Sequence, residues 1–292
     1  MKEWIFEDDD VQFQLDDVKN FKQNRQNRQT TITNALHVDF QEYKEAIKKV
    51  KKQIKKGNTY LLNLTFETKL KGDIDLESIF YDANVPFKLH IKNKFVCFSP
   101  ERFVQIKNNQ ISTYPMKGTI EASIPHALEK ILANQKEMSE HTMVVDLLRN
   151  DLGIVGKNVQ VEKFRYVEKI NAGKKELLQV SSKITAKVDD SWHENLGDIL
   201  KKILPAGSIT GTPKRKTVEI IKKIENYKRG FFTGVFGYYD GDSFDSAVMI
   251  RFIEKKDGGY VYKSGGGITL DSDAISEYEE MKDKVYVPML KL

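Results

Sequence analysis

The sequence predicts an α+β fold, because strands and helices follow one another from Asp39 onward without a regular strand–helix–strand repeat. Two pairs of strands are joined by short polar turns, at Asn108–Asn109 and at Asp240–Asp242, which is typical of β-hairpins. Other segments place apolar residues three and four positions apart, which is typical of helices that bury one face. These observations argue against a parallel sheet built from βαβ units.

The first elements lie in the N-terminal part of the chain. Residues 20–34 are polar and poor in apolar groups, so we expect a loop or a loosely ordered segment there. A helix should follow, capped by Asp39 with Glu42 three residues on, and ended by Gly57. Its apolar stripe is formed by Phe40, Tyr43, Ile47, Val50 and Ile54.

The remaining elements are expected in a fixed order along the chain. Strands are predicted over residues 59–70, 94–115, 230–252 and 257–267, and helices over 133–151, 212–230 and 273–290. In the helix over 212–230, we expect Thr212 as the N-cap, Pro213 at the first helical position and Gly230 beyond the end.

Composition limits the class of protein. The chain has 292 residues, of which 40% are hydrophobic and 30% charged, and it contains no run of the roughly 20 apolar residues that span a bilayer. The acidic N-terminus lacks the apolar stretch of a signal peptide, so a cytoplasmic protein is expected. Cys97 is the single cysteine and there are five histidines, which makes a soft-metal site improbable.

The net charge of +5 raises the question of nucleic acid. The densest basic run, residues 48–56, belongs to the amphipathic helix after Asp39, so its lysines should cover the solvated face of a packed helix. No RNA-binding aromatic motif and no zinc-finger spacing is present. We therefore expect no nucleic-acid partner.

Several residues could carry chemistry, and the pattern alone leaves each of them open. Glu137 and Glu140 share one helical face, and Glu277 and Glu280 share another, with Lys284 one turn further on. Such faces are more often solvated than functional, but two of them brought together would suit Mg2+, which prefers oxygen ligands. The glycines at 265–267 could end a strand or let backbone N–H groups approach a carboxylate. Lys117, within "YPMKGT", could be an ordinary solvated charge or a substrate contact.

The chain resembles the chorismate-utilising enzymes, the group of anthranilate, aminodeoxychorismate and isochorismate synthase large components, and most of all aminodeoxychorismate synthase component I. The matching blocks occur in family order from residue 40 onward: "SPERF", "PMKGT", "EHTMVVDLLRNDLG", "LPAGSITGTPKRKTVEII", "RGFFTGVFGYYDGD", "IRF" and "SGGGITLDSDAISEYEEMKDK". The resemblance implies large packed antiparallel or mixed β-sheets flanked by helices, with the site in a cleft between them. It also implies a shortened N-terminal extension over 1–38 and a chorismate-binding catalytic domain over 39–292.

The family's roles transfer residue by residue. Glu140 and Glu280 correspond to Mg2+ ligands, with Glu137 and Glu277 behind them through water. Arg251 and the N–H groups of Gly265, Gly266 and Gly267 correspond to the receptor of the enolpyruvyl carboxylate, and Lys284 adds charge beside the ring carboxylate. Glu101 corresponds to the general acid for the departing 4-hydroxyl, and a raised pKa would suit that task. The other expected substrate contacts are Thr119, Gln179, Ser208, Thr210 and Phe232.

Two positions favour one activity within the family. Lys117 takes the place of an alanine that is typical of anthranilate synthases, so the resemblance implies a nucleophile that attacks ring carbon 2 of chorismate. A nearby Mg2+ and a desolvated pocket would depress its pKa. The basic residue that activates water in isochorismate synthases corresponds here to Leu61, which disfavours water as the nucleophile. Gln179 and Phe232 depart from the histidine and tyrosine that are usual in the family.

The implied function is Mg2+-dependent amination of chorismate to 4-amino-4-deoxychorismate, in the route to 4-aminobenzoate and folate. Ammonia would come from a separate glutamine amidotransferase subunit. Two alternatives within the family stay open, an anthranilate synthase component I and a chorismate-binding subunit with little catalysis. A basic nucleic-acid-binding protein is the alternative from another class.

Overall fold

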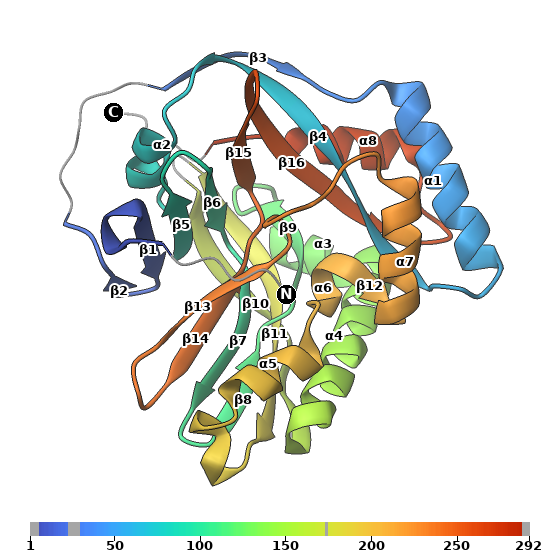
Figure 1. Cartoon of the computed structure of the whole chain (residues 1–292). Helices are drawn as coiled ribbons and strands as arrows, with labels where there is room; N and C mark the ends of the chain where they lie inside the picture. Colours follow the sequence, from blue (N-terminus) through green and yellow to red (C-terminus); the bar gives the residue numbers. More distant parts are fainter. Residues whose placement is uncertain (1–5, 23–29, 173–174, 288–292) are drawn as a thin grey trace.

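Two antiparallel β-sheets form the framework of the computed structural model, which describes residues 6–22, 30–172 and 175–287 (Figure 1). Within these residues the first sheet has nine strands. Their order is β12 (Gly211–Thr212), β4 (Leu61–Asp73), β16 (Gly259–Ile268), β15 (Phe252–Lys256), β6 (Phe95–Ser99), β5 (Phe87–Ile91), β1 (Val11–Leu15) and β2 (Val18–Lys19), while β3 (Thr31–Leu36) also pairs with β4.

The second sheet has seven strands in the described part of the chain, again paired antiparallel throughout. Their order is β10 (Lys157–Ala172), β11 (Lys175–Lys187), β8 (Gln110–Thr113), β7 (Arg102–Lys107), β14 (Phe244–Val248) and β13 (Val235–Tyr239), while β9 (Met116–Glu121) also pairs with β11. The two sheets confirm the predicted α+β class with large packed sheets.

The helices cover the sheets in two groups (Figure 1). They are α1 (Phe40–Lys55), α2 (Leu76–Asp82), α3 (Ala127–Ala133), α4 (Gln135–Val155), α5 (Leu196–Ile203), α6 (Gly207–Thr210), α7 (Lys214–Ile224) and α8 (Ala274–Asp283), with short 3-10 helices at Asp8–Asp10 and Asp190–His193. Helices α1, α7 and α8 pack on β4 and β16, whereas α4, α5 and α6 pack beside the second sheet.

Helix α1 forms as its apolar stripe predicts. Asp39 caps it by accepting a hydrogen bond from the backbone N of Gln41 at 2.8 Å, and Gly57 follows its end with a φ of 72°. Tyr43, Ile47 and Val50 are buried against the first sheet. The lysines of this helix therefore lie away from the core, as predicted.

A cluster of apolar side chains lies between the two sheets. Phe95 and Phe252 of the first sheet stack with ring centroids 4.7 Å apart, and Phe252 also meets Phe232 at 5.8 Å. Phe232 belongs to the segment that leads into β13 of the second sheet, beside the buried Met249. Burial of these large rings is a major apolar contribution that holds the sheets together.

Some predicted boundaries were wrong. Residues 31–36 form strand β3 rather than a loop, because this edge strand pairs with β4 through its backbone and needs few buried side chains. Residues 23–29 of that predicted loop lie outside the described residues. The last helix ends at Asp283 and not at 290, and residues 288–290 also lie outside the described part.

Helix α7 also differs from its prediction at both ends. Pro213 is the N-cap and Thr212 is a strand residue of β12, because the Thr212 carbonyl accepts a hydrogen bond from the backbone N of Tyr60 at 2.9 Å. The helix ends at Ile224, well before Gly230. Glu225 leaves the helix with an extended backbone, and its carboxylate is bound by Thr65 and Arg229. Tertiary contacts thus override the local signals at both ends.

No helix in the described part of the chain has the length and apolar character needed to cross a membrane.

Candidate active site

A cavity of about 490 Å³ lies where the two sheets and helices α4 and α8 meet. Its walls include Asn63 and the three glycines 265–267 from the first sheet, and Lys117 and Gln179 from the second. Of the residues singled out from the sequence, all line this cavity except Thr210. The fold therefore brings together residues that are up to 223 positions apart, from Leu61 to Lys284.

Two helices bring acidic side chains to the cavity from their first two turns. Asn134 caps α4 by accepting a hydrogen bond from the backbone N of Glu137, and Asp273 caps α8 in the same manner. Acidic residues near a helix N-terminus are stabilised by the helix dipole. Glu137 and Glu140 of α4 and Glu277 and Glu280 of α8 consequently line one cavity, as the sequence predicts for faces that come together.

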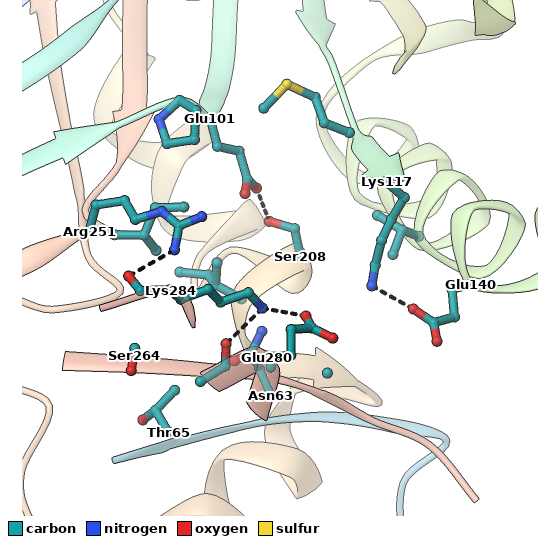
Figure 2. Close-up of a pocket in the computed structure, with 18 of the residues that line it drawn as sticks. Asn63, Thr65, Glu101, Lys117, Glu140, Ser208, Arg251, Ser264, Glu280 and Lys284 are labelled. Atoms are coloured by element: carbon teal, nitrogen blue, oxygen red, sulfur yellow. Dashed lines mark hydrogen bonds and ion pairs between the residues drawn. The ribbon is translucent and has the colours of Figure 1, made fainter. Parts of the chain in front are cut away.

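Lys117, on β9, is bound to this acidic group (Figure 2). Its Nζ donates a hydrogen bond to Glu140 Oε2 at 2.5 Å. Burial, the largest single influence, lowers the pKa of Lys117, but the carboxylates of Glu140, Glu137 and Glu280 together raise it above its usual value. Burial thus acts in the expected direction, but in this structure the carboxylates outweigh it, and the expected effect of Mg2+ on this pKa stays a prediction.

Glu101 has the environment of a proton donor. It follows β6 at the chain segment that leads into β7, and the hydroxyl of Ser208 donates a hydrogen bond to its Oε1 at 2.6 Å (Figure 2). Burial raises the pKa of the Glu101 carboxyl, while Ser208 and the charges of Lys117 and Arg251 lower it in part. The net pKa is raised, as expected for a carboxyl that is protonated near neutral pH.

A cationic group lies beside the three glycines. Lys284 Nζ donates hydrogen bonds to Gly265 O at 3.0 Å and to Glu280 Oε1 at 2.6 Å, and Arg251 Nη1 donates to Lys284 O at 3.2 Å (Figure 2). A Cβ at Gly266 would point at the side chains of Glu277, Lys284 and Glu280, 3.4 to 3.8 Å away. This part of the cavity can receive an anion between fixed positive charges and open backbone.

The other predicted substrate contacts are placed as follows. Gln179 and Thr119 are register partners on β11 and β9, and both line the cavity. Phe232 lines it while its ring remains in the core between the sheets. The structure does not bring Thr210 to the cavity, because its hydroxyl turns back within α6 and donates to Ala206 O at 2.8 Å.

The sequence reasoning missed Lys136 and Lys263, which also line the cavity. Lys136 lies in the first turn of α4, where the helix dipole disfavours a cation, and that conflict is a signal the sequence carried. Lys263 is buried on β16, where its Nζ lies 2.8 Å from Glu254 Oε2. Nothing in the alternating pattern of that strand indicates a buried lysine.

The residues present fit a hard divalent cation in the chemistry of their donors. Of the five carboxylates that line the cavity, four belong to α4 and α8, and among these Glu137 Oε2 is buried without a hydrogen-bond partner in the described part of the chain. Among the described residues, no three acidic, histidine or cysteine side chains gather closely enough to hold a metal ion alone. Mg2+ commonly binds one or two protein carboxylates and completes its coordination shell with water and substrate. An incomplete set of protein ligands is therefore compatible with Mg2+.

The site is a cleft between two large sheets, lined by acidic side chains, a buried carboxyl and two cations beside three glycines. A family model for the chorismate binding enzymes matches residues 3–290, and this chain belongs to that family.

Relatives agree with the family, and a solved structure agrees with the fold. A Haemophilus influenzae protein named "Uncharacterized PabA-like protein" is 50% identical over 86% of this chain and 76% of its own length. Aminodeoxychorismate synthase component 1 of Salmonella typhimurium is 34% identical over 84% of this chain and 56% of its own length. The structure of anthranilate synthase component I from Streptococcus pneumoniae superposes with a TM-score of 0.75 at 24% identity, over 87% of this chain and 59% of that one. The chain thus spans little more than half of two of these three proteins.

Proposed function

We propose that the chain is the large component of a Mg2+-dependent aminodeoxychorismate synthase, which converts chorismate and ammonia to 4-amino-4-deoxychorismate. One observation carries the proposal: Lys117 enters the cavity as a nucleophile candidate, while Leu61, which lines the same cavity, leaves the other family position without a basic group. The similarity to aminodeoxychorismate synthase component 1 supports it.

The chain's own residues divide the reaction into two displacements. The Lys117 amine attacks ring carbon 2 of chorismate and gives up a proton, the two conjugated ring double bonds shift towards carbon 4, and the 4-hydroxyl leaves as water after Glu101 gives it a proton. Ammonia then attacks carbon 4 and gives up a proton, both double bonds shift back, and the bond from carbon 2 to the Lys117 nitrogen breaks, so that Lys117 takes up a proton and leaves as the free amine. Glu101 lies where Ser208 fixes its carboxyl, so the proton donor is held in place before substrate enters.

Lys117 must leave Glu140 and lose its proton before it can attack, because an ammonium has no free electron pair. Glu140 and Glu280, with Glu137 and Glu277 beside them, would hold Mg2+, which supplies positive charge for the ring carboxylate of chorismate when bound. Arg251 and the backbone N–H groups at 265–267 would receive the enolpyruvyl carboxylate, and Lys284 would add positive charge beside the ring carboxylate.

Ammonia is expected from a separate glutamine amidotransferase subunit. The name "component 1" of the Salmonella relative supports a partner of this kind. The product would enter the route to 4-aminobenzoate and folate.

One experiment tests the proposal directly. The protein is incubated with chorismate, Mg2+ and ammonium, and the products are identified by mass spectrometry. We expect 4-amino-4-deoxychorismate. Anthranilate with pyruvate would instead support the anthranilate synthase alternative, and unchanged chorismate would support a binding subunit with little catalysis.

A further inference from the structure

Three carboxylates of the candidate metal site, those of Glu140, Glu277 and Glu280, are paired with ammonium groups. Glu140 has one oxygen 2.5 Å from Lys117 Nζ and the other 3.9 Å from Lys136 Nζ. Lys136 Nζ also lies 3.7 Å from Glu277 Oε1, so it bridges helices α4 and α8. Two lysines therefore neutralise the carboxylates that would otherwise repel one another across the cavity.

The position of Lys136 in its helix is electrostatically unfavourable for a positive charge. It is the second residue of α4, where the unpaired N–H groups and the helix dipole oppose positive charge. Its side chain is 57% exposed, whereas those of Glu140 and Glu277 are only 12% and 4% exposed. The ammonium thus lies at the rim over two buried carboxylates and can move into solvent without breaking any packed core.

We propose that Lys136 is a resident counter-ion of the metal site, which holds α4 and α8 together without metal and is displaced when a divalent cation binds. This inference rests on the proposed function, because it takes Glu140 and Glu277 as part of the metal site. Lys136 is a positioning residue and takes no part in the chemical step.

A displaced counter-ion has two opposite effects, which separate it from a residue that only stabilises the fold. Without metal, the ion pairs of Lys136 stabilise the protein. With metal, the same ion pairs must be broken and therefore weaken the observed binding of the cation. Removal of the ammonium should lower the stability of the metal-free protein and tighten metal binding at the same time.

The test uses Lys136→Met, which keeps the length of the side chain and removes its charge. Binding of Mn2+, which shares the preference of Mg2+ for carboxylate oxygens, is measured from the electron paramagnetic resonance of free Mn2+, with and without chorismate. We expect about three- to tenfold tighter binding of Mn2+ in K136M. Lys136 makes two partly exposed ion pairs, and each of them is worth up to about a fivefold change in affinity. The metal-free Tm should fall by about 2 °C.

Two matched variants complete the design. Lys136→Arg retains the charge and should keep both the wild-type affinity and the wild-type Tm. Lys130→Met removes an exposed lysine of α3 that makes no ion pair with the described residues, and it should change neither quantity.

The outcomes separate this inference from the proposed function. Equal or weaker Mn2+ binding in K136M, with normal binding by the wild type, overturns the role of Lys136 alone. Wild-type protein that binds no Mn2+ in either condition overturns the metal site and this inference with it. Anthranilate as the product of the wild-type enzyme overturns the proposed activity, and tighter Mn2+ binding in K136M would still support the inference.

Discussion

The proposed roles of Lys117 and Glu101 require opposite protonation behaviour in one cavity. The lysine must lose a proton to act as a nucleophile, while the glutamic acid must keep one to act as an acid. Their surroundings treat them differently: carboxylates raise the pKa of Lys117, and burial raises the pKa of Glu101. At the scale of single residues, burial thus shifts the pKa of Glu101 in the direction that a general acid needs, and Lys117 is ion-paired with Glu140.

The role of Lys117 predicts a covalent adduct. In the absence of ammonia, chorismate should accumulate on Lys117, and the protein mass should increase by that of chorismate minus water. Peptide mapping should place the mass on the peptide that contains Lys117. Lys117→Ala should abolish the adduct, whereas Lys130→Ala should retain it. Intact-protein spectra without an adduct, under conditions in which ammonia later gives product, would show that Lys117 acts only through its charge.

The raised pKa of Glu101 predicts a pH dependence. The acid works only while protonated, so kcat/KM should fall as the pH rises through its raised pKa. The hydrogen bond from Ser208 stabilises the ionised form, so Ser208→Ala should raise the pKa further and move this limb to higher pH. Glu101→Gln should lose about 10²-fold or more in kcat and lose the limb. An unchanged limb in Ser208→Ala would contradict the assignment.

At the scale of the element, β16 combines two functions in consecutive glycines. Gly265 packs so closely on β4 that an added Cβ would overlap the backbone carbonyl of Leu64. At Gly266 the added Cβ would instead point at Glu277, Glu280 and Lys284, at ordinary contact distances. The first glycine therefore permits the strand pairing, and the second keeps the cavity open.

These two glycines predict different outcomes for the same substitution. Gly265→Ala should destabilise the protein by about 1–3 kcal/mol, because strand β4 must move away from the new methyl group. Gly266→Ala should leave Tm within about 2 °C of the wild type and raise KM for chorismate, because the methyl group enters the space for substrate. Thermal unfolding and steady-state kinetics measure the two effects. Equal losses of stability in both variants would contradict this division.

At the scale of the whole molecule, Arg102 connects the two sheets. From β7 of the second sheet it binds Asp245 of β14 through two hydrogen bonds of 2.8 and 3.0 Å. It also pairs with Asp16, between β1 and β2 of the first sheet. Its guanidinium lies 5.1 Å from the ring of Phe87 on β5. These contacts with Asp245, Asp16 and Phe87 form the Arg102 clamp. Because Arg102 directly follows Glu101, the clamp also fixes the chain segment that carries Glu101.

The clamp predicts a large loss of stability on its removal. Arg102→Met should lower the free energy of unfolding by about 2–4 kcal/mol, because Asp245 would remain half-buried without its partner. Asp245→Asn in the same variant should recover part of the loss, since the unpaired charge disappears. Lys107→Met, at the exposed end of β7, is the control. Denaturant unfolding measures all four proteins, and a loss below about 0.5 kcal/mol in Arg102→Met would contradict the clamp.

Much of the fold and 15 of the 30 residues that line the candidate cavity could be predicted from the sequence. Hairpin turns and helical periodicity identified α1, α4, β4, β16 and the β13–β14 hairpin, because their signals are local. The long β10–β11 hairpin, α2 and β5 were missed, since their charged or short segments carry no clear periodicity. The family motifs predicted a set of candidate residues, and the structure places all of them on the cavity wall except Thr210.

The sequence by itself determined which residues are candidates for the chemistry, because motif identity and spacing are properties of the chain. Only the tertiary structure decided how their charges interact. It paired Lys117 with Glu140, set Lys136 between α4 and α8, and turned Thr210 away from the cavity. The physical reason is distance: the energy of two charges depends on separation and burial, and neither is defined until residues far apart in the chain meet.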